Sequence, residues 1–320
     1  MNNALKMKII THDQIKSLNI SPLSWFDWAA EVLRQKYSFT MPPKIAIHWA
    51  DSYFNTMPSI LASEGRMGVK VVDRFTNRNP SVLSKLLLYD SDAGEPLALM
   101  DATLITAMRT GAVTIHSMEL LAKRDANVVG FMGFGNIGAA CLDVLAERYR
   151  EKPLTVKFLR HKDHFDMAQK RYANYPNFRL LLVESAEQVI RESDVVISAI
   201  TFTDQILGRD DWFKAGCLVI PVHLRGFQNC DLFFDKVCGD DRGQVQGFKY
   251  FNRFKSFAET AEVVCGTKPG RESDDERIIV YNVGLSLHDV YAAAKIYELA
   301  TARGFGIEVP PMSPSEKFWM

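Results

Sequence analysis

Apolar residues recur at two different spacings along the chain, and the change of spacing divides it. Near the start, apolar residues at helical spacing follow Ser21 and Pro22, an N-cap serine and a proline at the first helical position, which predicts an amphipathic helix. Short apolar runs separated by Gly, Asn, Asp and Pro then predict strands at residues 45–47, 53–54, 68–72 and 86–89. With a hairpin turn at residues 91–94, we expect a small antiparallel sheet, followed by a long helix over residues 101–123.

Strands and helices alternate from residue 125 onward. The predicted strands lie at residues 128–132, 154–159, 180–183, 195–199, 218–221, 236–238 and 278–281. Helices are expected at residues 137–149, 163–173 and 286–302. A capping box of Ser185 and Gln188 predicts one more short helix, which begins after Ser185. This alternation predicts an α/β fold whose Rossmann-type parallel sheet is covered on both faces.

The composition narrows the possible ligands. The 38 basic and 38 acidic residues cancel, so no net field draws the chain to nucleic acid or to a membrane, and a small neutral or zwitterionic ligand is favoured. Five scattered cysteines without a C-x-x-C pair argue against a disulfide framework and a zinc site, and we expect them to be reduced and mostly buried.

Nothing in the sequence predicts a secretory leader or a membrane span, so a cytoplasmic protein is expected. His12, His48 and His116 are isolated and are interpreted as structural, with no metal site. The tail at residues 310–315 is expected to be extended.

A glycine-rich turn carries the clearest chemical signal. It directly follows a predicted strand and directly precedes a predicted helix, and it consists of Gly133, Phe134, Gly135, Asn136, Ile137 and Gly138. In this G-x-G-x-x-G context the first glycine permits the tight turn, the second lets the backbone approach a pyrophosphate, and the third allows close helix packing. The free N–H groups at the start of the helix attract phosphates, so the sequence predicts a dinucleotide cofactor.

The residues after the second strand of this unit bear on the choice of cofactor. An acidic residue there is typical of NAD binding, but the chain has Arg160, His161 and Lys162. Because basic side chains form charge-assisted hydrogen bonds with a 2′-phosphate, NADP(H) is favoured over NAD(H). The alternative is a solvated loop without a ligand.

Further motifs are spread over nearly the whole chain. They lie at residues 57–58, 68–70, 94–98, 100–101, 106–112, 212, 216, 266, 269–271 and 284–289. With the glycine turn, they resemble the ornithine cyclodeaminase/mu-crystallin family, which also includes alanine dehydrogenase-like and imine reductase-like enzymes. The resemblance implies a smaller α+β substrate-binding and dimerisation domain at residues 1–124, completed by residues 285–320. Residues 125–284 would form the Rossmann domain, and the protein would be a homodimer.

The resemblance also implies roles for individual residues. Lys70 and Arg109 would hold the substrate carboxylate, which agrees with their chemistry, since a guanidinium grips a carboxylate with two hydrogen bonds and an ammonium adds a point charge. Taken alone, Arg109 would be interpreted as a surface arginine and Lys70 as an ordinary lysine on a strand. Cofactor contacts are also assigned to Thr110, Ala199 and Thr201.

Three positions depart from the cyclodeaminase pattern. Asn55 replaces a glutamate that receives the distal amine of the substrate, Arg225 stands where a loop aspartate transfers a proton, and Lys44 replaces an arginine. A diamino acid substrate is therefore disfavoured. His223 and Arg225 become the candidates in this loop, where a histidine of near-neutral pKa exchanges a proton or is merely structural.

Two carboxylates complete the candidate residues. Asp231 matches a structural glutamate of the family, and Asp289 either caps the last helix or lies near the nicotinamide.

Three functions are compatible with these residues. The first is an NAD(P)H-dependent oxidoreductase acting on the C–N bond of a small amino acid or the matching imino or keto acid. The second is cyclodeamination of ornithine to proline and ammonia. The third is NADPH-dependent binding of a small ligand without turnover, as in mu-crystallin.

Overall fold

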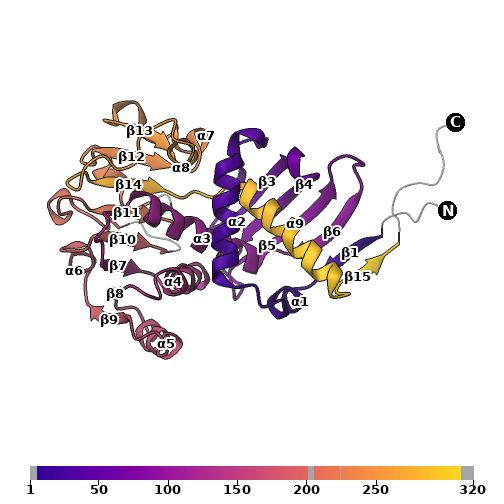
Figure 1. Ribbon diagram of the computed structural model, residues 1–320, viewed down its shortest axis with the longest axis horizontal. Coiled ribbons are helices and arrows are strands. Elements are labelled where there is room, and N and C mark those ends of the chain that lie inside the picture. The colour runs from indigo at the N-terminus through magenta and orange to yellow at the C-terminus, as the bar shows by residue number, and fades with distance from the viewer. Residues whose placement is uncertain (1–5, 201–204, 224, 311–320) are drawn as a thin grey trace. The chain divides into compact units, whose positions relative to one another are not determined.

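The computed structural model describes residues 6–200, 205–223 and 225–310. By packing, the chain divides into two compact units. Among the described residues, unit 1 contains 6–20, 37–106 and 286–310, and unit 2 contains the remainder. Each unit is built on one β-sheet (Figure 1). The predicted domain limits after residues 124 and 284 stay a prediction, because a division by packing does not show which segments bind the substrate and which bind the cofactor.

The sheet of unit 1 has seven strands in the order β15-β1-β6-β5-β4-β3-β2. They are β1 (Met7–Ile10), β2 (Ile45–Trp49), β3 (Ser52–Leu61), β4 (Arg66–Arg74), β5 (Val82–Asp90), β6 (Pro96–Asp101) and β15 (Ile307–Val309). Neighbours are antiparallel except for β1 and β6, which are parallel. The antiparallel sheet predicted within residues 44–100 is confirmed by β2 to β6, whereas β1 and β15, which extend it, were not predicted because they are too short to show a readable alternation.

Helix α9 (Ser286–Ala302) covers one face of this sheet and crosses β3, β4 and β5 (Figure 1). Gly68 on β4 permits this close packing, since a Cβ there would lie 3.2 Å from Cγ2 of Val290 and 2.8 Å from the carbonyl oxygen of Leu87. The short helix α1 (His12–Ser17) is capped by Thr11, whose hydroxyl accepts a hydrogen bond from the N–H of Gln14.

The opposite face of the same sheet carries a row of apolar side chains. Residues that pair across strands point to the same face, so the registers place six of them in line: Pro58, Val69, Leu87, Leu99, Ile9 and Ile307. At the far edge, Ile47 and Trp49 on β2 are 59% and 76% exposed. The row is half-buried at four of its residues and exposed at Leu99 and Ile307, so this face is apolar and partly accessible to solvent, in contrast to the face beneath α9.

The sheet of unit 2 has eight parallel strands in the order β13-β12-β14-β11-β10-β7-β8-β9. They are β7 (Val128–Met132), β8 (Leu154–Leu159), β9 (Phe178–Val183), β10 (Val195–Ser198), β11 (Leu218–Pro221), β12 (Lys236–Gly239), β13 (Phe257–Glu259) and β14 (Ile278–Tyr281). The predicted fold class is confirmed. Because the chain runs from β7 to β8 and β9 on one side and returns to β10 on the other, the strand order reverses at β7, and ligands bind such sheets at this reversal.

The helices of unit 2 follow the predicted pattern closely. They are α2 (Pro22–Gln35), α3 (Thr103–Leu121, counted in this unit from residue 107), α4 (Asn136–Arg148), α5 (His164–Arg171), α6 (Ala186–Ile190), α7 (Arg242–Val245) and α8 (Thr260–Val264). The hydroxyl of Ser21 caps α2 by accepting from the N–H of Ser24 at 3.0 Å, as predicted. The capping box at Ser185 is only half formed, because the side chain of Gln188 accepts from the N–H of Glu184 instead of Ser185.

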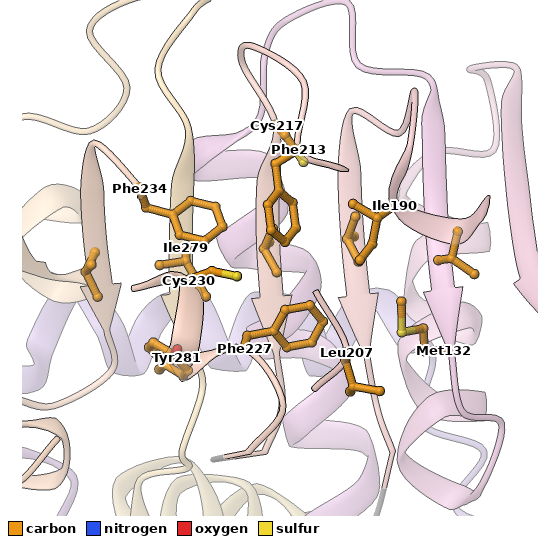
Figure 2. Close-up of a cluster of buried hydrophobic side chains, with 14 of the residues drawn as sticks. Met132, Ile190, Leu207, Phe213, Cys217, Phe227, Cys230, Phe234, Ile279 and Tyr281 are labelled. Carbon is orange, nitrogen blue, oxygen red and sulfur yellow. The ribbon is translucent and has the colours of Figure 1, made fainter. Parts of the chain in front are cut away.

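An aromatic segment covers one face of the unit 2 sheet near β11 and β14. Figure 2 shows Phe213, Phe227 and Phe234 packed over these strands, with Cys230 among them. The four cysteines 141, 217, 230 and 238 are buried, whereas Cys265 is exposed. None of the described helices is long and apolar enough to cross a membrane.

Candidate functional site

The glycine turn after β7 has no room for side chains at two of its three glycines. Gly133 has φ +88°, and a Cβ there would lie 2.8 Å from the carbonyl carbon of Ala199. A Cβ at Gly138 would lie 2.1 Å from the carbonyl oxygen of Gly133. The first and third glycines are therefore required by the backbone itself, and the turn packs directly against the end of β10.

The second glycine faces open space and fits a phosphate-bearing ligand. Among the described residues, no heavy atom lies within 4 Å of a Cβ built at Gly135, and this residue is the N-cap of α4, so its own side chain cannot cap the helix. The start of α4 thus presents backbone N–H groups and the positive end of a helix dipole to a pyrophosphate. Asn136 is exposed and Ile137 half-buried, whereas the side chain of Phe134 packs inward on Phe158, with ring centroids 5.5 Å apart.

A carboxylate that the sequence analysis missed lies at the end of β9. The parallel register of β8 and β9 pairs Leu159 with Val183, and the next side chains along, Arg160 and Glu184, meet. Nε of Arg160 lies 2.8 Å from both carboxylate oxygens of Glu184, and both side chains are more than half exposed. His161 and Lys162 are also exposed. The basic cluster therefore has an acidic neighbour, Glu184, which lies after β9 and not directly after β8, where an acidic residue was expected for NAD binding.

Helix α3 packs closely against the helix that starts at the glycine turn. A Cβ at Gly111 would lie 2.6 Å from the carbonyl carbon of Ala140 on α4, so only a glycine permits this approach. The two preceding residues, Arg109 and Thr110, are 7% and 6% exposed. The alternative interpretation of Arg109 as a surface arginine was therefore wrong. The close approach of α4 explains why a glycine follows the Arg-Thr pair.

The ends of β10 and β11 bring together a serine and a histidine. Oγ of Ser198, a fully buried residue, lies 2.7 Å from Nε2 of His223. Burial lowers the pKa of His223 to about 4, although a hydrogen bond with the backbone of Arg225 opposes this shift. The imidazole is therefore neutral at physiological pH, and its pKa is not near neutrality as the sequence analysis expected. Arg225 is exposed, and Thr201 lies outside the described residues.

In unit 1, the candidate lysine forms an ion pair in the interior. Nζ of Lys70 lies 2.6 Å from Oδ2 of Asp289, and both side chains are fully buried. Lys70 is thus not an ordinary exposed lysine, and Asp289 pairs with it from the first turn of α9, an arrangement that neither interpretation of Asp289 anticipated.

Asn55 shares the face of the sheet that carries Lys70. Met57 pairs with Lys70 across β3 and β4, and Asn55 lies two residues from Met57 on the same side. Oδ1 of Asn55 is buried and accepts no hydrogen bond from the described part of the chain. Lys44 directly precedes β2, whose Ile45 pairs with Thr56. The joint binding of one carboxylate by Lys70 of unit 1 and Arg109 of unit 2 stays a prediction.

Asp231 is a second buried carboxylate, in the core of unit 2. It is 1% exposed, and Oδ1 accepts a hydrogen bond of 2.5 Å from the hydroxyl of Tyr281. Burial raises the pKa of Asp231 to about 7, against the effect of this hydrogen bond. Asp231 is therefore packed in the core, as expected of a structural residue, but burial brings its pKa near neutral pH.

We expect Asp231 to make the unfolding free energy fall as the pH rises from about 4 to 7. In this window the native state holds a proton that the unfolded state has released, since an ordinary aspartate has a pKa of about 3.9, and the slope approaches about 1.4 kcal/mol per pH unit. Urea denaturation between pH 4.5 and 8.5 measures it. The Asp231→Asn variant should lack this slope, and equal pH profiles for the two proteins would contradict the assignment.

Comparison with known proteins identifies relatives over most of the chain. Residues 7–304 match the model of the ornithine cyclodeaminase/mu-crystallin family. The nodulation efficiency protein NfeD of Rhizobium meliloti is 29% identical over 84% of this chain and 87% of the relative. The N-((2S)-2-amino-2-carboxyethyl)-L-glutamate dehydrogenase of Staphylococcus aureus is 28% identical over 81% and 82%. The resemblance drawn from the motifs is confirmed.

Solved structures agree with this relationship. The Δ(1)-pyrroline-2-carboxylate reductase of Thermococcus litoralis, in complex with NADH and L-proline, superposes with a TM-score of 0.82 at 26% identity over 95% of this chain and all of that one. An archaeal alanine dehydrogenase dimer with bound NAD gives a TM-score of 0.82 at 25% identity over 95% and 99%.

Proposed function

Because this chain belongs to the ornithine cyclodeaminase/mu-crystallin family, we propose that it is an NAD(P)H-dependent oxidoreductase acting on the C–N bond of an amino acid and of the matching imino or keto acid. The observation that carries this proposal is the uncapped start of α4, where Gly135 leaves open space for a pyrophosphate. The names of the reductase and dehydrogenase relatives designate amino acids or a cyclic imino acid with a carboxylate beside the reacting carbon.

The substrate carboxylate is bound by Lys70 and Arg109, with Lys44 adding positive charge. When bound, the nicotinamide cofactor supplies or accepts the hydride at the substrate Cα. The buried Oδ1 of Asn55 suits a hydrogen-bond donor on the substrate, such as a neutral or secondary amine. A neutral amide does not stabilise a second ammonium group as a carboxylate does, which favours a monoamino acid over ornithine.

His223 accepts the proton that the substrate amine releases on oxidation. A low pKa keeps its imidazole in the neutral form that accepts a proton from a substrate amine. The Ser198 hydroxyl at 2.7 Å orients the ring, and Arg225 contributes through its backbone.

A substrate panel tests the proposal. NADPH and NADH oxidation is followed with pyruvate or glyoxylate plus ammonia or methylamine, and with Δ(1)-pyrroline-2-carboxylate and Δ(1)-piperideine-2-carboxylate. Turnover of a member of this panel is expected. Formation of proline and ammonia from ornithine with catalytic NAD would instead identify a cyclodeaminase. Tight cofactor binding without turnover of any member would indicate a binding protein.

We predict that NADP(H) is preferred and that Glu184 weakens this preference. The carboxylate of Glu184 holds Arg160 and repels a 2′-phosphate, so the Glu184→Gln variant should bind NADPH several-fold more tightly and NADH unchanged, as about 0.5–1 kcal/mol is typical of an exposed charge pair. Titration of cofactor fluorescence measures both affinities. Glu187→Gln removes a carboxylate that pairs with Arg191 and serves as the control. Equal effects on the two cofactors would contradict the prediction.

The protein forms a homodimer through the open face of the unit 1 sheet. The apolar row on that face and the exposed Ile47 and Trp49 support this assembly, as does the dimer named for the archaeal alanine dehydrogenase. Light scattering at micromolar concentration should give twice the monomer mass, and Ile47→Glu should give the monomer. Met167→Glu introduces the same charge at an exposed residue of α5 and should remain dimeric. A monomeric native protein would exclude this assembly.

A further inference from the structure

Gly284 lies against the Nη1–Nη2 edge of the guanidinium group of Arg109. The backbone of Gly284 has φ +98°, in the left-handed region that favours glycine. A Cβ at this residue would lie 2.6 Å from Nη1, 2.9 Å from Nη2 and 3.2 Å from Cζ of Arg109. Every atom that such a side chain would meet first belongs to the head group of this single arginine.

The peptide groups on both sides of Gly284 are held by side chains of unit 2. Its N–H donates to Oδ2 of Asp240 at 2.5 Å, and its carbonyl oxygen accepts from Nε2 of Gln244 at 3.0 Å. Asp240 is fully buried at the end of β12 and its own carbonyl oxygen accepts from Nζ of Lys36 at 2.7 Å. The backbone of Gly284 is thus held by hydrogen bonds to Asp240 and Gln244, and Asp240 is in turn held by a hydrogen bond from Lys36.

We infer that Gly284, held by Asp240 and Gln244, positions the guanidinium of Arg109 for a planar substrate carboxylate. A bidentate contact requires the guanidinium group to be oriented within a narrow range of angles, and a glycine without a side chain lets the Nη1–Nη2 edge of this group approach the backbone. Asp240 and Gln244 act through Gly284 and are positioning residues. The inference rests on the proposed role of Arg109 in binding the carboxylate.

The test measures selectivity for a carboxylate with a probe that cannot react. Isothermal titration of the full-length, cofactor-loaded protein compares pyrrole-2-carboxylate with pyrrole-2-carboxamide. Gly284→Ala should lower the preference for the carboxylate at least about tenfold, since displacement of a binding group by about 1 Å has effects of this size or larger. The affinity for the cofactor should stay within about twofold. The double variant Gly284→Ala/Arg109→Ala should lose no more than Arg109→Ala alone, because both changes remove one interaction.

Gly266→Ala is the matched control. This glycine also has a positive φ, +71°, and lies in unit 2, but no atom of the described chain lies within 4 Å of a Cβ built there. Gly266→Ala also places a side chain on a backbone with positive φ but does not displace Arg109, and it should retain the preference. Should Gly284→Ala fail to fold, Asp240→Asn and Gln244→Met replace it. Each of them should lower the preference for the carboxylate over the carboxamide, by less than Gly284→Ala would.

The outcomes separate the inference from the function on which it rests. If Gly284→Ala or its substitutes keep the carboxylate preference while Arg109→Ala loses it, the positioning role is wrong and the proposed function stands. If the wild type shows no preference, or Arg109→Ala retains it, the proposed role of Arg109 fails, and the inference fails with it.

Discussion

Replacing Arg109 with alanine is expected to lower kcat/KM for a 2-oxo or imino acid by roughly 30-fold to 4,000-fold, which corresponds to about 2–5 kcal/mol for removal of one partner of a buried, hydrogen-bonded charge pair. The residue is 7% exposed, so water compensates little for the lost guanidinium. Steady-state kinetics at saturating cofactor measure this loss. The dissociation constant of the cofactor should not change.

Arg109→Lys is the informative companion of this variant. It keeps the charge but presents no planar pair of donors, so an intermediate loss is expected, mainly in KM. Full activity of Arg109→Ala would contradict the assignment of this residue to the carboxylate, whatever reaction the protein catalyses. A parallel loss of cofactor affinity would show that the variant disturbs the contact of α3 with α4 at Gly111 instead.

Breaking the ion pair of Lys70 and Asp289 on one side is expected to lower the unfolding free energy by about 3–5 kcal/mol, because the remaining charge stays buried without its partner. Lys70→Met and Asp289→Leu should each show this loss in urea denaturation. The double variant should recover most of the stability, since an apolar pair of similar volume replaces a desolvated ion pair. Although folded, it should remain inactive, because the ammonium group that we propose to bind the substrate carboxylate is gone.

An exposed ion pair in the same unit provides the control. Lys6 and Glu308 lie 2.9 Å apart, and each side chain is more than half exposed. Lys6→Met should cost less than about 1 kcal/mol, as is typical of surface pairs. If Lys70→Met is as mild as Lys6→Met, the buried pair contributes little. Activity in the double variant would exclude Lys70 from substrate binding.

The Rossmann unit could be predicted from the sequence because its signals are local. Gly138 is required by its contact with the carbonyl oxygen of Gly133, five residues earlier, and the N-cap at Ser21 acts on the N–H of Ser24. Strand and helix periods in residues 125–284 repeat often enough to be read without tertiary information. The short β1 and β15 could not be predicted in this way, because three or four residues show no period.

The residues that surround each candidate side chain follow from tertiary structure instead. Asp289 meets Lys70 only when α9 packs on β4, and Glu184 meets Arg160 only because β8 and β9 are parallel and in register. Burial, which no local pattern reports, moves the pKa of His223 to about 4 and that of Asp231 to about 7.

By itself, the sequence determined the class of fold, the dinucleotide turn and the family, because backbone conformation, helix capping and the spacing of apolar residues depend on near neighbours. Only the tertiary structure decided that Lys70 is a buried ion-pair partner, that His223 is neutral beside Ser198, and that Gly284 lies against the guanidinium edge of Arg109. Charge, protonation and side-chain orientation depend on desolvation and on groups that are remote in the chain, and these come together only when the elements pack.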